Sequence, residues 1–205
     1  MSEPVEIRSG LWRWTAPHPE WRPGARSESA DDWPREVGSV LFEAADATAL
    51  IDPLVPAAGE RAFMGWLDRR IQGRGLPVAI LTTIQFHRRS RDQLVERYGA
   101  STSRAKKRFP DEVESIPIRG AGETMFWLAE QRALIPGDRI IGAAGGGLRV
   151  CPESWLRYLP SRLGVAELRD RLRGLLELPL ESVVVSHGEP VLRRGRAALA
   201  KALEG

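Results

Sequence analysis

A short run of apolar residues, Pro77–Thr82, constrains the fold more than any other stretch of the chain. It has the length of a β-strand and carries no charge, which predicts a strand covered on both of its faces. Residues 57–72 come before it, with apolar positions at helical spacing, and Gly73 and Gly75 mark the end of this helix. A helix that leads into a doubly covered strand is typical of α/β domains, in which helices pack on a sheet.

Other patterns extend this unit in both directions along the chain. We predict further strands at Val37–Phe42, Thr48–Asp52, Val113–Ile118, Thr124–Leu128, Ala133–Ile135, 140–141 and Ser182–Ser186, and helices at about 91–98, 153–159, 164–176 and 191–203. No repeat, low-complexity tract or linker interrupts this series. We therefore expect a single mixed α/β domain over residues 1–205.

Composition excludes several classes of protein. The 205 residues are 42% hydrophobic and 28% charged, which is ordinary for a globular protein and excludes a wholly disordered chain. No apolar run approaches the roughly 18 residues of a membrane span. Cys151 is the only cysteine, so an intrachain disulfide and a cysteine-rich zinc site are both excluded. Because residues 1–10 also lack the pattern of a secretory signal, we expect a cytoplasmic protein.

The charge balance says little in favour of a nucleic-acid partner. Thirty Lys and Arg against 27 Asp and Glu give a formal net charge of only +3. One stretch does concentrate cations, namely Arg88, Arg89, Arg91, Arg97, Arg104, Lys106, Lys107 and Arg108. Acidic residues lie among them, which favours a solvated surface over a phosphate-binding face. We expect a small-molecule substrate or ligand, and neither a nucleic acid nor a membrane as partner.

The N-terminal segment, residues 1–36, is rich in aromatic rings and proline. It contains four tryptophans and one histidine, namely Trp12, Trp14, His18, Trp21 and Trp33. The favoured interpretation is that these rings pack on the sheet or form a face between two copies of the chain, as in a homodimer. The alternative is a wall or lid beside a binding site, because tryptophan offers a large rigid contact area.

Three polar loops follow predicted strands, and each carries a residue that can bind a metal ion. These residues are His87, Asp138 and His187. Loops at strand ends often carry function, because the sheet holds their ends in place. Two imidazoles and one carboxylate suit zinc, iron(II) or manganese and leave positions open for water or substrate. The sequence therefore offers a site for one transition-metal ion, whose bound water would ionise near neutral pH.

Arg88 offers an alternative that needs no metal. A guanidinium stays charged and pairs well with a carboxylate, so an inward-pointing Arg88 could neutralise Asp138. A buried, unpaired carboxylate is very costly, and Asp138 therefore needs a metal ion, Arg88 or a set of hydrogen bonds. Both solutions stay open, and Asp138 and Arg88 are the candidate catalytic residues.

Four stretches of the chain resemble the metallo-β-lactamase-fold superfamily. They are Leu50–Pro53, Ile80–Thr82, Ala133–Asp138 and Ser186–Pro190, and the resemblance runs from about Val37 to the end. In this superfamily such segments form an early strand ending in aspartate, the strand before the His-x-His-x-Asp-His loop, the turn with the metal-bridging aspartate, and the loop with the last histidine ligand. The resemblance implies a four-layer αββα sandwich, with two mixed β-sheets face to face and helices outside.

The metal-binding motifs depart from the family pattern. Thr83, Gln85, His87 and Arg88 stand where the His-x-His-x-Asp-His loop has its four ligands, and the stretch 118–124, where the middle histidine belongs, contains no histidine. This implies a degenerate metal site that has lost the dinuclear zinc centre.

Three functional hypotheses remain open. The first is a hydrolase-family member of reduced, altered or absent activity. The second is a mononuclear metal-dependent hydrolase of an ester, thioester or lactone that uses His87, Asp138 and His187, with Arg88 or the tryptophan-rich segment orienting an anionic substrate. The third is a non-catalytic scaffold that binds a small molecule or a protein.

Overall fold

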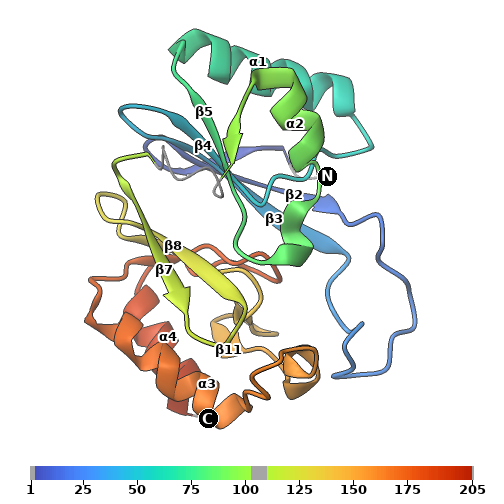
Figure 1. The fold of residues 1–205 in the computed structure, drawn as a ribbon, viewed down its shortest axis with the longest axis vertical. Helices are drawn as coiled ribbons and strands as arrows, with labels where there is room; N and C mark the ends of the chain where they lie inside the picture. The colour runs from blue at the N-terminus through green and yellow to red at the C-terminus, as the bar shows by residue number, and fades with distance from the viewer. Residues whose placement is uncertain (1–2, 103–109, 205) are drawn as a thin grey trace.

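The computed structural model describes residues 3–102 and 110–204, and within them two mixed sheets lie face to face (Figure 1). The first sheet has the strand order β1 (Val5–Arg8), β2 (Leu11–Pro17), β3 (Glu36–Glu43), β4 (Thr48–Ile51), β5 (Val78–Leu81) and β6 (Ser101–Thr102). The second has the order β12 (Ser182–Val183), β9 (Ala133–Ile135), β8 (Glu123–Leu128) and β7 (Val113–Ile118). A separate antiparallel pair consists of β10 (Ile140–Gly142) and β11 (Leu148–Val150).

Helices cover the outer face of each sheet. Helices α1 (Glu60–Arg74) and α2 (Arg91–Tyr98) lie on the first sheet, and α3 (Val165–Leu172) and α4 (Gly195–Glu204) lie on the second (Figure 1). Three short 3₁₀ helices connect the elements, namely η1 (Gln85–Arg88), η2 (Glu153–Leu156) and η3 (Arg173–Glu177). The four-layer αββα arrangement with two mixed sheets is thus confirmed.

Apolar side chains fill all three interfaces between these layers. Between the sheets, Val40 and Ile51 of the first pack in one cluster with Phe126 and Ile135 of the second. Two further clusters lie on the outer faces, one beneath α1 and α2 and one beneath α3 and α4. Burial on both faces explains the uninterrupted apolar run at β5, where all four residues are buried.

The last predicted strand is shorter than the sequence indicated. Only Ser182–Val183 pairs as a strand with β9, although the apolar run continues to Val185. After Val184 donates to the carbonyl of Leu134, the chain leaves the second sheet and joins the first, where Ser186 accepts a hydrogen bond from the amide of Gly38. This crossing places the loop that follows at the junction of the two sheets.

Three predicted helices are also shorter than the sequence indicated. The pattern at 153–159 forms only the 3₁₀ helix η2, and the pattern at 164–176 divides into α3 and η3. The last helix begins at Gly195, because Val191 is still paired in a β-bridge with Val183.

The aromatic N-terminal segment contributes two strands that were not predicted, the edge strand β1 and its neighbour β2. Trp14 is buried against Phe63 of α1, and the ring of Trp12 contacts Trp66. These two tryptophans therefore pack on the sheet, as expected, whereas Trp33 lies elsewhere, beside His187.

Two further expectations concern the basic stretch and membrane-spanning helices. Four members of the predicted basic stretch, Arg104, Lys106, Lys107 and Arg108, lie outside the described residues. Among the helices that the structure does describe, we find none with the length and apolar character that crossing a bilayer requires.

Candidate functional site

The three predicted ligands come together at one edge of the two sheets. His87 belongs to η1 after β5, Asp138 to the turn after β9, and His187 to the loop that crosses between the sheets. The Nε2 atom of His87 lies 3.0 Å from Asp138 Oδ1, and that of His187 lies 3.2 Å from the same oxygen. All three side chains are almost fully buried. Among the described residues they are the one group of His, Cys, Asp and Glu side chains that could hold a metal ion.

Asp52 holds the opposite side of the His87 ring. Its Oδ2 lies 2.8 Å from His87 Nδ1, and Thr83 donates its amide (2.9 Å) and its hydroxyl (2.5 Å) to the same carboxylate. In the structure Asp52 adopts a positive φ of 48°, and its carboxylate orients His87. Through this contact the Nε2 atom of His87 is directed toward Asp138.

Glu123 shapes the turn that presents Asp138. Its carboxylate accepts hydrogen bonds from the amides of Gly137 (3.1 Å), Asp138 (2.6 Å) and Arg139 (3.0 Å). In the sequence this stretch is marked only by its lack of a histidine, and the role of Glu123 was not predicted. A glycine is required at 137, because a Cβ there would lie 2.5 Å from the Thr83 hydroxyl.

The arginine near the site is Arg89, and the inward placement considered for Arg88 is wrong. Arg88 is exposed and does not line the site. Arg89, at a positive φ of 42°, turns inward and donates to the carbonyls of Gly38 (2.7 Å) and Asp52 (2.9 Å) and to the hydroxyl of Ser186 (2.6 Å). The reversal of the chain at Arg89 sends consecutive side chains in opposite directions, a feature that spacing along the sequence does not reveal.

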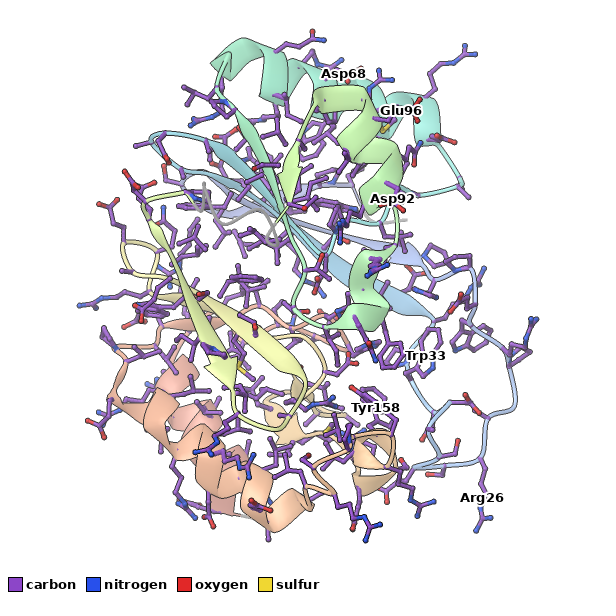
Figure 2. The ribbon with its side chains drawn as sticks, in the orientation of Figure 1. Arg26, Trp33, Asp68, Asp92, Glu96 and Tyr158 are labelled. Carbon is purple, nitrogen blue, oxygen red and sulfur yellow. The ribbon has the colours of Figure 1, made fainter. Side chains whose placement is uncertain are left out.

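A pocket of about 760 Å³ opens onto the three ligands, and we call it the site pocket. Aromatic rings form much of its wall: Trp33 and Trp155 contact the ring of His187, and Phe86 and Tyr158 stack edge to face at 4.9 Å. Residues 26–31 line its outer side. Figure 2 shows Trp33 and Tyr158 on the side where the loop before β3 stands away from the body, with Arg26 at its outer end. The N-terminal segment therefore both packs on the sheet and walls the site.

A buried arginine supports this wall from behind. Arg139 is completely buried, donates to the carbonyl of Ala121 (2.9 Å) and donates to the hydroxyl of Tyr158. Its charge also faces Glu123, although burial is the largest influence on both groups and raises the pKa of Glu123 to about 7. The turn at Asp138 and the pocket wall at Tyr158 are therefore held by one network.

The surroundings of the cluster shift the pKa values of its two imidazoles in opposite directions. Burial and Arg89 act to lower the pKa of His87, but the carboxylates of Asp138 and Asp52 outweigh them and raise it to about 9. Burial opposes ionisation of Asp138, yet the adjacent imidazoles hold its pKa well below the usual range. Burial lowers the pKa of His187. Without another cation present, the cluster at neutral pH therefore contains a charged His87, an ionised Asp138 and a neutral His187.

The donor atoms of the cluster fit a transition-metal ion. Oδ1 of Asp138 is buried and has no hydrogen-bond partner of ordinary geometry among the described residues, although two imidazole nitrogens approach it. The separations of 3.0 and 3.2 Å are close to the roughly 3.3 Å between ligands about 2.0–2.1 Å from one tetrahedral ion. The Asp52–His87 contact also matches the carboxylate–imidazole pairs that orient metal ligands. Nδ1 of His187 has no such partner, and the rings of Trp33 and Trp155 surround it instead.

Comparison with solved structures identifies the fold. A metallo-β-lactamase from Erythrobacter litoralis matches with 14% identity over 98% of this chain and 91% of its own, at a TM-score of 0.64. A metallo-β-lactamase from Hirschia baltica matches with 14% identity, coverage of 98% and 97%, and a TM-score of 0.57. A metallo-β-lactamase family protein from Thermus thermophilus matches with 16% identity, coverage of 97% and 80%, and a TM-score of 0.51.

These likenesses extend over nearly the whole of this chain and 80–97% of the other chains, so the shared feature is the fold as a whole. No protein-family model matches the sequence, and no curated protein matches it. The resemblance stated from the sequence is thus confirmed at the level of the fold, and the low identities mark a divergent chain.

Proposed function

We propose that this chain, a divergent protein with the metallo-β-lactamase fold, is a hydrolase with an altered metal site that holds one transition-metal ion. The ligands are His87, Asp138 and His187, and the dinuclear centre typical of this fold is lost. The observation that carries the proposal is the convergence of two imidazole nitrogens on one buried carboxylate oxygen in the wall of a pocket. Zinc, iron(II) and manganese all suit this set of ligands.

The chain's own residues prepare this site for hydrolysis. Asp52 accepts the Nδ1 proton of His87, which leaves the Nε2 lone pair free for the metal. Trp33 and Trp155 pack against the ring of His187 and help to hold it in place. The metal, when bound, would lower the pKa of a bound water to near neutral and so supply a nucleophile.

The aromatic wall of the site pocket suits a substrate with an apolar group next to the bond that is cleaved. Such a group can pack against the four aromatic rings that line the pocket, namely those of Trp33, Phe86, Trp155 and Tyr158. An ester, thioester or lactone is the class of substrate we propose. Arg88 is exposed and does not line the pocket, so it is not part of this proposal; Arg26 and Arg157 do line it.

Metal analysis tests the proposal directly. Purified protein, prepared without chelator, should contain about one equivalent of metal, and metal at 100 times its Kd should stabilise the fold by about 2.7 kcal/mol. His187→Ala should lose the metal, whereas His18→Ala, a histidine that lines the same pocket but is not a ligand, should keep it. Less than about 0.1 equivalent in the wild type, with no stabilisation by added zinc, manganese or iron(II), would rule out a metal enzyme.

A second candidate, a non-catalytic scaffold that binds a small molecule, is favoured by one specific observation. The raised pKa of His87 means that a protonated imidazole, together with the Arg89 guanidinium, can balance the charges of Asp138 and Asp52. The cluster is then electrically satisfied without metal. A chain that contains metal and hydrolyses a series of aryl esters and thioesters supports the first candidate, and a metal-free chain that binds such compounds without turnover supports the second.

A further inference from the structure

A second hollow, of about 880 Å³, lies apart from the three metal-ligand candidates, between β11, α3 and α4. Figure 1 shows α3 and α4 on the outer face of the second sheet, away from η1. Five cationic side chains line this hollow, namely Arg149, Arg169, Arg193, Arg194 and Lys201. We call it the arginine hollow. One carboxylate, Glu28, also lines it.

The cations of the arginine hollow have no protein partners among the described residues. None of the five forms an ion pair or a side-chain hydrogen bond there, and Nε of Arg169 is buried without an acceptor. The nearby acids of α3 are already used, because Glu167 pairs with Arg171 and Asp170 pairs with Arg173. Five positive charges around one depression repel one another, so an anion bound there would relieve that repulsion.

The floor of the arginine hollow is apolar. It is built from Leu148 and Val150 of β11, Val165 at the start of α3, Val191, and Ala198 of α4. One side of the rim is the pair Gly146 and Gly147, which have no side chains to close the opening. A ligand of matching chemistry combines a strongly anionic group at the rim with an apolar part on the floor.

We propose that the arginine hollow binds a small molecule that carries a phosphate group and an apolar portion. Guanidinium groups bind phosphate through paired hydrogen bonds, and several of them together favour a doubly charged phosphate over a single carboxylate. This site is separate from the proposed metal centre, because none of His87, Asp138 and His187 lines it. Glu28 lines both the arginine hollow and the site pocket, so the two openings are neighbours.

Titration calorimetry with octyl phosphate, and with inorganic phosphate for comparison, tests the proposal on the full chain. Octyl phosphate, below its aggregation concentration, should bind at least tenfold more tightly than inorganic phosphate, because it fills the floor as well as the rim. The double variant Arg149→Gln/Arg193→Gln should lower the affinity for octyl phosphate at least tenfold. The matched double variant Arg61→Gln/Arg119→Gln removes two exposed arginines elsewhere and should leave binding unchanged.

The apolar floor is tested separately with Val165→Ser. This variant should bind octyl phosphate more weakly than the wild type does, whereas its affinity for inorganic phosphate should be unchanged. Equal losses in the two double variants would overturn the proposal, because they would show only a general effect of net charge. So would equal affinities for the two phosphates, or binding confined to vesicles of anionic phospholipid. Metal content should stay the same in every one of these variants, so failure here is distinguishable from failure of the metal-site proposal.

Discussion

At the scale of single residues, the site depends on side chains that hold other side chains in place. Asp52 and Arg89 are both buried or half-buried, and both adopt positive φ values that non-glycine residues rarely take. Such strain is maintained only where the surroundings over-determine it, and it is concentrated at functional sites. Here the Asp52 carboxylate fixes His87, and the Arg89 guanidinium ties together the backbones of Gly38 and Asp52.

Asp52→Asn should weaken zinc binding about tenfold, the lower end of the 10–100-fold loss typical when a partner of a metal ligand is removed. An amide has nearly the same shape but no charge, so it makes His87 a less basic ligand. Zinc affinity measured by competition with a chromogenic chelator gives the result. Asp46→Asn, in the exposed turn between β3 and β4, is the control. Unchanged affinity in Asp52→Asn would exclude His87 as a ligand that Asp52 supports.

Gly137→Ala should destabilise the fold by about 1–3 kcal/mol, because the added methyl would overlap the Thr83 hydroxyl and crowd the Glu123 carboxylate. Gly73→Ala is the matched control: its Cβ would meet no atom within 4 Å, and it lies inside α1. Replacing a glycine inside a helix by alanine should stabilise that variant by about 0.5–1 kcal/mol, because glycine loses more conformational freedom on folding. Urea denaturation measures both, and a Gly137→Ala protein as stable as wild type would contradict the crowded turn.

At the scale of elements, α1 and α2 are fastened to each other by a polar contact on the surface. Asp68 of α1 accepts hydrogen bonds from Arg97 (2.9 and 2.6 Å) and from the hydroxyl of Tyr98 (2.7 Å), both at the end of α2. The hydrogen bond from Arg97 is the main reason that the pKa of Asp68 is lowered. Because η1 leads directly into α2, this contact helps to set the position of the segment that carries His87.

Asp68→Asn should lower the melting temperature at pH 7 by about 2–4 °C, the shift expected for a loss near 1 kcal/mol in a domain of this size. A carboxyl whose pKa is lowered by folding stabilises the fold above its unfolded pKa near 4, and this contribution disappears as the pH falls through the folded value. The difference between variant and wild type should therefore shrink at pH 3.

Asp92→Asn serves as the control for this measurement. Asp92 lies on α2 with its side chain 94% exposed, pointing away from the body, as does the neighbouring Glu96 (Figure 2). Its replacement should change the melting temperature little at either pH. An Asp68→Asn deficit of the same size at pH 7 and pH 3 would mean that the carboxylate charge is not what stabilises the contact.

At the scale of the whole molecule, the site exists because the chain changes sheets. Residues 182–184 pair with β9 of the second sheet, and Ser186 and His187 then pair with β3 of the first. His187 is therefore held at the seam between the sheets, facing His87 from one sheet and Asp138 from the other. Gly38 must be small at this crossing, because a Cβ there would lie 2.8 Å from the carbonyl of Val185.

Much of this architecture follows from local patterns in the sequence. The apolar run Pro77–Thr82 required cover on both faces, and α1 and the second sheet supply it. The loops that carry His87, Asp138 and His187 could be identified because each follows such a run. Strands β1 and β2 were missed, because β1 has only four residues and the two tryptophans and the proline of β2 obscure the alternation of a half-buried strand.

Which side chains meet at the site was decided only by the tertiary structure. Spacing along the chain made Arg88 the candidate partner of Asp138, but Arg88 is exposed, whereas Arg89, at a positive φ, points inward and donates to the carbonyl of Asp52. Asp52, Glu123 and the five cations of the arginine hollow lie far apart in sequence and acquire their roles from neighbours across strands and helices. Local sequence encodes periodicity and turns, whereas the direction of a side chain and its distant partners depend on how the layers pack, which no single segment contains.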